Sequence, residues 1–112
     1  MKIKNIFVSL GSRMLASPDS ILLLKAELNY TKIYLNNGDV WLSSTNLGQI
    51  AKRLEPYNFL RPNRSVLLNA MYLKEYNEVG GYLKMKNQEV FKISRRKIKE
   101  FQFLSNCTSK VD

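Results

Sequence analysis

A β-hairpin in the second quarter of the chain constrains the fold more than any other feature. Residues 31–35 alternate between two faces, with Lys32 and Tyr34 on one of them, and residues 40–43 return as a partner strand. Such alternation is typical of a half-buried strand. Between the strands, Asn37-Gly38 predicts a type I′ turn, because both central residues of that turn need a positive φ.

A second hairpin and a buried strand extend this pattern. Residues 82–86 alternate, Asn87-Gln88 is the expected turn, and residues 90–93 form the return strand. The run Ile21 to Leu24 is apolar throughout. It indicates a strand that is buried on both faces or lies at the centre of a sheet.

One α-helix is predicted between the hairpins. Residues 47–54 carry apolar side chains at positions i, i+3, i+4 and i+7, which gives a single apolar stripe. Asn46 is suited to cap the first turn, and Pro56 is expected to stop the helix. Together with the hairpins, this predicts a mainly β fold of antiparallel strands and hairpins with a few short helices.

Length and charge restrict the function classes. The 112 residues make one domain, with residues 1–104 as the folded unit and residues 105–112 as a flexible polar tail. There are 18 Lys+Arg against 9 Asp+Glu, a formal net charge of +9. This charge favours a polyanionic partner, but DNA-binding, ribosomal and membrane-surface proteins all share it.

The residue types needed for catalysis and metal binding are absent or isolated. There is no histidine, which removes the commonest general base and the usual zinc ligand. The nine carboxylates form no obvious close pair in a helical or strand register. We therefore expect no enzyme activity, no metal and no cofactor.

The expected location is the cytoplasm. Cys107 is the only cysteine, so no intrachain disulfide can form, which agrees with a reducing compartment. The longest apolar run, residues 21–24, is far shorter than the roughly 20 residues of a membrane span. The first residues also lack the pattern of a secretory signal, and no membrane association is expected.

The segment Arg61-Pro62-Asn63-Arg64 lies between two apolar runs and carries side chains suited to nucleic acid. Arginine and asparagine pair with phosphates and base edges. Pro62 biases Arg61 toward extended backbone and cannot lie in the middle of a sheet. The segment is therefore expected in a surface loop or at a strand end, with Arg61 and Arg64 pointing outward. Asn69, further on, is expected to bond backbone groups.

A first cluster lies where the chain must turn before the first hairpin. It contains Asn29, Tyr30 and Lys32. Asparagine is favoured in turns for its backbone tolerance, and Tyr30 suits either a core or an interface. Taken alone, this cluster leaves a structural role and a binding role open.

A third cluster, Arg95, Arg96 and Lys97, opens a predicted helix whose Ile98 and Phe101 are expected to face inward. Helix N-termini carry partial positive charge, so each cation there costs about a few tenths of a kcal/mol. A bound phosphate would offset this cost. The structural alternative is an exposed basic turn.

Three motifs together resemble a known family. They are Asn29-Tyr30-Thr31, the block Phe59-x-Arg61-x-x-Arg64-Ser65-x-x-x-Asn69 and Ser94-Arg95-Arg96, and they are similar to those of the LytTR DNA-binding domain of bacterial transcriptional regulators. The resemblance covers roughly residues 5–103. It implies an elongated, mostly antiparallel β fold with a few short helices, whose loops enter successive major grooves from one side of the duplex.

By position, the resemblance implies three DNA-contacting loops. Arg64, Arg96 and Asn29 would read base edges, while Arg61 and Lys97 would contact the backbone. The family commonly has histidine where this chain has Asn63, although asparagine also pairs with adenine. The whole set expected to face DNA is Asn29, Tyr30, Lys32, Arg61, Asn63, Arg64, Arg95, Arg96 and Lys97.

The resemblance also bears on regulation. Family members often carry a receiver domain before the DNA-binding part, and at 112 residues this chain is too short to hold one. We therefore expect a stand-alone domain or a fragment of a longer regulator, without phosphorylation control in cis.

The leading hypothesis is a sequence-specific transcriptional regulator that binds double-stranded DNA. Repeated half-sites near one helical turn apart, occupied by a homodimer, are the expected arrangement. The alternative is an RNA or single-stranded nucleic-acid-binding β module. It would stack bases on exposed aromatics such as Tyr30, Tyr34, Trp41 and Tyr82. A protein-interaction domain with an acidic partner is a third class, and an enzyme comes last.

Overall fold

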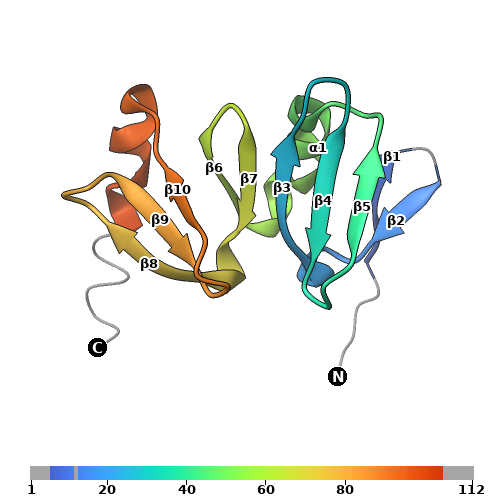
Figure 1. The fold of residues 1–112 in the computed structure, drawn as a ribbon, viewed down its shortest axis with the longest axis horizontal. Helices are drawn as coiled ribbons and strands as arrows, with labels where there is room; N and C mark the ends of the chain where they lie inside the picture. Colours follow the sequence, from blue (N-terminus) through green and yellow to red (C-terminus); the bar gives the residue numbers. More distant parts are fainter. Residues whose placement is uncertain (1–5, 12, 105–112) are drawn as a thin grey trace.

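The computed structural model describes residues 6–11 and 13–104 (Figure 1). The predicted tail at residues 105–112 and the lone Cys107 lie outside them. The strands are β1 (Val8–Gly11), β2 (Met14–Ala16), β3 (Ile21–Ala26), β4 (Thr31–Leu35), β5 (Val40–Ser43), β6 (Phe59–Asn63), β7 (Val66–Asn69), β8 (Leu73–Asn77), β9 (Tyr82–Met85) and β10 (Val90–Lys92). The helical elements are α1 (Leu47–Leu54) and the 3₁₀ segments η1 (Pro18–Ser20), η2 (Glu55–Tyr57), η3 (Ala70–Tyr72) and η4 (Arg95–Phe101). Among the described residues, no helix is long and apolar enough to cross a membrane.

A five-stranded antiparallel sheet forms the centre of the molecule, in the order β5-β4-β3-β7-β6. The apolar run of β3 lies in its middle, and Ile21, Leu23 and Leu24 are fully buried. Because the register shifts between Ile21 and Leu23, Ile21 lies on the same face of the sheet as Leu24, and Leu23 lies on the opposite face. The prediction of a central buried strand is confirmed.

One face of this sheet packs against α1 and the β1–β2 hairpin. The apolar stripe of α1 buries Leu47, Ile50 and Leu54 in this first core. Asn46 caps the helix, since its side-chain oxygen accepts a hydrogen bond of 2.9 Å from Gln49 N. Pro56 lies in η2, directly after the helix. The predicted start, stripe and end of α1 are all confirmed.

The opposite face packs against a three-stranded antiparallel sheet, in the order β10-β9-β8, and against η4. Leu23 and Leu68 of the large sheet meet Leu83 and Met85 of the small sheet in this second core. Phe101 is buried there too, and Ile98 packs against it. The inward direction predicted for these two η4 side chains is confirmed.

Lys25 joins the two sheets at the margin of the second core. Its Nζ donates to Glu89 Oε2 at 2.8 Å and lies 5.0 Å and 5.6 Å from the ring centres of Tyr34 and Phe91. The hydrogen bond to Glu89 is the main cause of a raised pKa for Lys25. The cation therefore connects the central strand of one sheet with the β9–β10 turn of the other.

The type I′ turn predicted at Asn37-Gly38 is wrong. Gly38 alone among residues 36–39 has a positive φ, of 99°. Leu35 O accepts from Gly38 N at 3.1 Å, and Leu35 N donates to Asp39 O at 2.9 Å. A three-residue loop of this kind, closed by one left-handed residue, competes with the two-residue turn. The Asn37 side chain favours it by accepting from Asp39 N.

The β9–β10 turn has the same construction. Met85 O accepts from Gln88 N, Met85 N donates to Glu89 O, and Asn87 Oδ1 accepts from Glu89 N. Gln88 occupies the left-handed position with a φ of 78°. The hairpin at residues 82–93 is confirmed, and an asparagine in the middle of each turn sets its shape.

Asn69 has a structural role. It is buried, and its Nδ2 donates to Pro18 O at 3.1 Å and to Ile21 O at 2.8 Å. Its Oδ1 accepts from Met71 N at 3.1 Å. The expectation that Asn69 bonds backbone groups is confirmed, and these bonds tie η1 and η3 to the sheet.

Candidate nucleic-acid interface

The three sequence clusters lie along one edge of the molecule. The β3–β4 connection, the β6–β7 turn and the start of η4 line the upper edge in Figure 1, while the β4–β5 and β9–β10 turns lie at the lower edge. The molecule measures 40 × 40 × 23 Å. Segments far apart in the sequence therefore form one continuous border.

The second cluster, Arg61 to Arg64, lies at the end of an edge strand. β6 is the outermost strand of the large sheet and includes Pro62, and its register shifts between Leu60 and Asn63. Proline lacks an N–H and is tolerated at such an edge or bulge. Of the predicted segment only Arg64 and the following residue, Ser65, form the turn. The strand-end alternative is thus the correct one, and the loop alternative is wrong for Arg61 and Pro62.

Three hydrogen bonds attach this strand to the third cluster. Ser94 N donates to Pro62 O at 2.9 Å. Lys97 Nζ donates to Arg61 O, also at 2.9 Å. Asn63 Nδ2 donates to Lys92 O at 2.8 Å. The second and third clusters therefore form one unit, although about 30 residues of sequence separate them.

Residues of both clusters line a cleft of about 400 Å³. Arg64 and Arg96 are exposed at its walls. Within the described part of the chain, neither guanidinium has a hydrogen-bond or ion-pair partner. The residues that line it are Arg61, Asn63, Arg64, Ser94, Arg96, Lys97 and Glu100. Two unpaired cations on one cleft make it an anion-attracting surface.

The helix predicted after Ser94 is a 3₁₀ segment of seven residues, and Ser94 does not cap it through its side chain. A short 3₁₀ helix aligns few peptide dipoles, so the expected phosphate site at its N-terminus has no support from helix geometry. Arg95 and Arg96 are exposed, whereas Lys97 is half-buried and bonded to β6. Arg95 lines a neighbouring cleft of about 390 Å³, next to Ile98.

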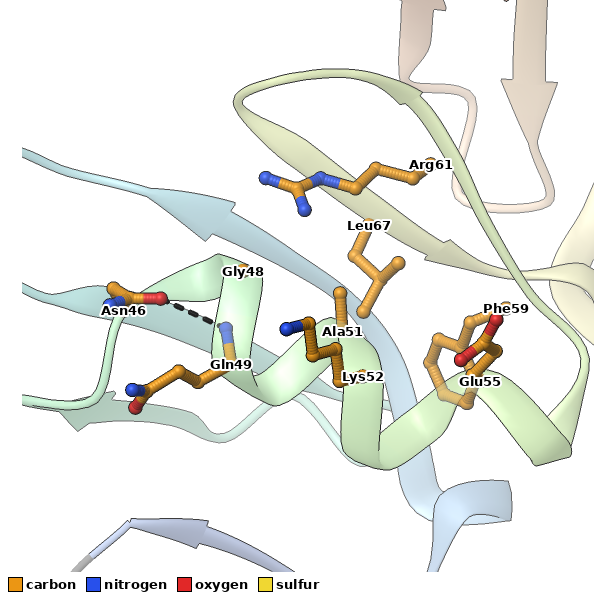
Figure 2. A pocket seen from close by; sticks show the side chains of 9 residues that line it. All are labelled: Asn46, Gly48, Gln49, Ala51, Lys52, Glu55, Phe59, Arg61 and Leu67. Carbon is orange, nitrogen blue, oxygen red and sulfur yellow. Dashed lines mark hydrogen bonds between the residues drawn. The ribbon is translucent and has the colours of Figure 1, made fainter.

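Arg61 lies between the Arg64–Arg96 cleft and a second one beside α1. This second cleft has a volume of about 530 Å³ and is lined by polar and apolar groups, among them Gln49, Lys52 and Phe59. Figure 2 shows the Arg61 side chain extending toward the first turn of α1. Its Nη2 donates to Arg64 O at 3.1 Å, so Arg61 also supports the β6–β7 turn.

The first cluster occupies the neighbouring connection. Asn29 and Tyr30 are exposed there, and Glu27 N closes the loop by donating to Tyr30 O at 2.8 Å. Ala26 N donates to Ser65 O at 2.8 Å, which fixes this connection beside the β6–β7 turn. Lys32 is half-buried on β4. These residues do not line the Arg64–Arg96 cleft and form a separate part of the same edge.

Glu100 is a cleft residue that the sequence interpretation missed. It lines the cleft together with Arg96 and Lys97. In a 3₁₀ helix, side chains three residues apart lie above one another, so the spacing from Lys97 to Glu100 was the available signal. An acid in this position opposes the attraction of an anion by the arginines.

The aromatic residues of the alternative hypothesis do not form a stacking surface. Tyr34 packs on the second core beneath Lys25, and Trp41 packs on the first core. Tyr82 lies in the small sheet, and its hydroxyl accepts a hydrogen bond from Asn77 Nδ2. Tyr30 lies on the β3–β4 connection. Proteins that bind single strands present several aromatic side chains together along one groove. Here the four aromatic residues lie at separate places in the fold.

Comparisons with known proteins give a consistent result. The family model of the LytTr DNA-binding domain matches residues 11–105. A solved LytTr DNA-binding domain from Bacillus cereus aligns with a TM-score of 0.69 and 18% sequence identity, covering 88% of this chain and 94% of that one. The comparison with curated proteins gave no match. At this identity the solved structure supports the fold, and the predicted mainly β architecture is confirmed.

Proposed function

The chain belongs to the LytTr DNA-binding domain family, and on that basis we propose that it reads double-stranded DNA in a sequence-specific manner, through loops in successive major grooves. DNA binding in transcriptional regulation follows from the family. The family is not a catalytic one, in agreement with the expectation that the protein is not an enzyme.

Arg64 and Arg96 are proposed as the main base readers. Arginine pairs in a bidentate manner with the O6 and N7 acceptors of guanine in the major groove, and it is the commonest specific contact. Both guanidinium groups are exposed on the walls of one cleft and unpaired within the described residues. Asn29, on the neighbouring connection, is proposed to read a further base, with Tyr30 beside it.

The other members of the set are proposed to hold the duplex backbone. Arg61, Lys97, Arg95 and Lys32 supply positive charge around the readers, and phosphate contacts fix register without reading sequence. Arg61 also borders the cleft beside α1 (Figure 2), where Lys52 adds a further cation. Asn63, at the end of β6, lines the same cleft as Arg64 and Arg96.

The observation that carries the proposal is the common edge of the three clusters. A duplex repeats its major groove about every 34–36 Å, and the edge belongs to a molecule 40 Å long. Loops spread along such a border are suited to successive grooves. Two copies on repeated half-sites, acting as a homodimer on DNA in the cytoplasm, complete the proposed arrangement.

Selection from randomised duplex DNA tests this function, with about 150 mM salt and with RNA and single-stranded competitors present. We expect a recovered motif, and log K should fall against log salt with a slope of about −5 if about six phosphates are contacted. Recovery of no motif, with RNA or single strands competing best, would instead support the single-strand module. Strong binding to an acidic protein without duplex binding would favour the interaction domain.

Arginine substitutions test the assignment of readers. Arg64→Ala and Arg96→Ala should each weaken binding to the selected duplex by about 1–3 kcal/mol and relax preference at one base pair. Lys86→Ala, at the opposite edge, removes one charge as a matched control and should change affinity little. Equal losses on selected and scrambled duplexes would remove the base-reading role of the arginines.

A further inference from the structure

Both polar atoms of the Asn63 side chain are already engaged by the protein itself. Nδ2 donates to Lys92 O at 2.8 Å, and Oδ1 accepts from Ser65 N at 2.8 Å. Lys92 O can only accept, so it must pair with the amide NH2 of Asn63, and Ser65 N–H can only donate, so it must pair with the amide oxygen. These two partners therefore fix the orientation of the amide. Reading adenine requires Nδ2 to donate to N7 and Oδ1 to accept from N6. The two bonds hold the amide in one orientation, and any rotation of Asn63 toward a base edge would break them.

The two partners of Asn63 belong to different DNA-facing segments. Ser65 lies in the β6–β7 turn beside Arg64, and Lys92 ends the strand that leads into Arg96. The bond from Ser94 N to Pro62 O runs beside this connection. Asn63 thus shapes one segment and links it to the next.

We propose that Asn63 is a positioning residue, which sets the distance between the Arg64 and Arg96 side chains so that both reach base edges at once. This inference rests on the proposed function, because it assigns Asn63 a role within that DNA interface. Arg64, exposed and unpaired among the described residues, is then the reader of the β6–β7 turn. Fixed contact geometry lowers the conformational cost of binding.

Two substitutions separate the bonds that Asn63 makes. Asn63→Asp keeps an oxygen that accepts from Ser65 N, but it has no N–H to donate to Lys92 O. Asn63→Ala removes both bonds. Amide hydrogen exchange of the free protein should show faster exchange at Ser94 in both variants, by about fivefold for the loss of one hydrogen bond. Exchange at Ser65 should rise only in Asn63→Ala.

A panel of single-base variants of the selected duplex tests the consequence for recognition. Asn63→Ala should lower discrimination at the base pairs of both arginines, by about tenfold in total, whereas Arg64→Ala should affect only its own base pair. Loss of discrimination at a single A·T pair, with Ser94 exchange unchanged, would make Asn63 a direct reader and overturn the proposal. If wild-type protein selects no duplex motif, the proposed function fails. In that case, unchanged amide exchange at Ser94 in both variants would independently show that Asn63 does not hold the β6–β7 turn to the segment that precedes η4.

Discussion

At the residue scale, the cleft contains one charge that opposes its ligand. Glu100 lies among Arg64, Arg96 and Lys97. A unit charge about 7 Å from a phosphate contributes roughly 0.6 kcal/mol of repulsion at the dielectric constant of water. An acid in this position would limit nonspecific attraction of the cleft to any duplex.

Replacement of that acid is therefore expected to tighten binding. Glu100→Gln should raise duplex affinity by roughly threefold at low salt, with a smaller gain at about 150 mM because exposed charges are screened. Fluorescence anisotropy titrations at two salt concentrations measure the change. Asp39→Asn, in the β4–β5 turn at the opposite edge, is the charge-matched control. An equal gain in both variants would assign the effect to net charge alone.

The sequence predicted which residues lie on a common surface better than the contacts that they make. Arginines in a proline-interrupted segment are recognisable from local composition, and the cleft contains Arg61, Arg64 and Arg96 as expected. The bond from Asn63 to Lys92 O was not predictable, because Lys92 lies 29 residues away and meets Asn63 only through tertiary packing, whereas the bond from Ser65 N is local. A side chain that binds backbone across the fold has the same local signature as one that binds DNA.

At the element scale, the sequence predicted α1, the central strand and both hairpins. These depend on periodicity and caps, which are local properties. The turn shapes were less accessible, since Asn37 and Asn87 each use a side-chain bond to select the longer loop. Likewise, the place of β6 at a sheet edge depends on which strands pair, so Pro62 could be assigned to a strand only once the topology was known.

The ion pair between Lys25 and Glu89 connects the two sheets and gives a test that depends on pH. Glu89→Gln should lower the free energy of unfolding by about 0.5 kcal/mol near pH 8, the range of partly exposed pairs. The hydrogen bond to Glu89 raises the pKa of Lys25 above its ordinary value of 10.5. The contribution is therefore complete below pH 10.5 and is lost as the pH rises through the higher folded value.

Urea unfolding of wild type and Glu89→Gln at pH 8 and pH 11 measures this difference. Because all other titrating groups are common to both proteins, their effects cancel in the comparison. We expect the two proteins to differ less at pH 11 than at pH 8. An equal difference in the free energy of unfolding at both pH values would show that the charge on Lys25 does not stabilise the contact between the sheets.

At the scale of the whole molecule, size restricts how two copies share a duplex. The three clusters follow an edge parallel to a 40 Å dimension. Copies that face the same side must be a whole number of helical turns apart, and one turn is only about 34–36 Å. Two copies one turn apart would overlap, so a separation of two turns, roughly 21 base pairs, is expected in place of a single turn.

Duplexes that carry two selected half-sites at about 10, 15 and 21 base pairs test this expectation. Native gel electrophoresis should show double occupancy at the longest spacing and mutual exclusion at the shortest. A duplex with one half-site scrambled provides the single-occupancy reference. Double occupancy at the shortest spacing would mean that the long edge does not lie along the duplex axis.

The two separate cores have a consequence for how such proteins change their targets. The β3–β4 connection joins the neighbouring strands β3 and β4 of the large sheet, whereas η4 packs on the second core and is bonded to β6 at the edge of that sheet. Both segments carry exposed side chains that are proposed to face DNA, so an exposed side chain of one segment can be replaced without changing the residues packed beneath the other. After gene duplication, one copy can therefore change its preference at one part of the DNA site while the rest of the site is still recognised. In the same way, an engineered library can randomise the exposed residues of a single segment and keep the contacts of the other.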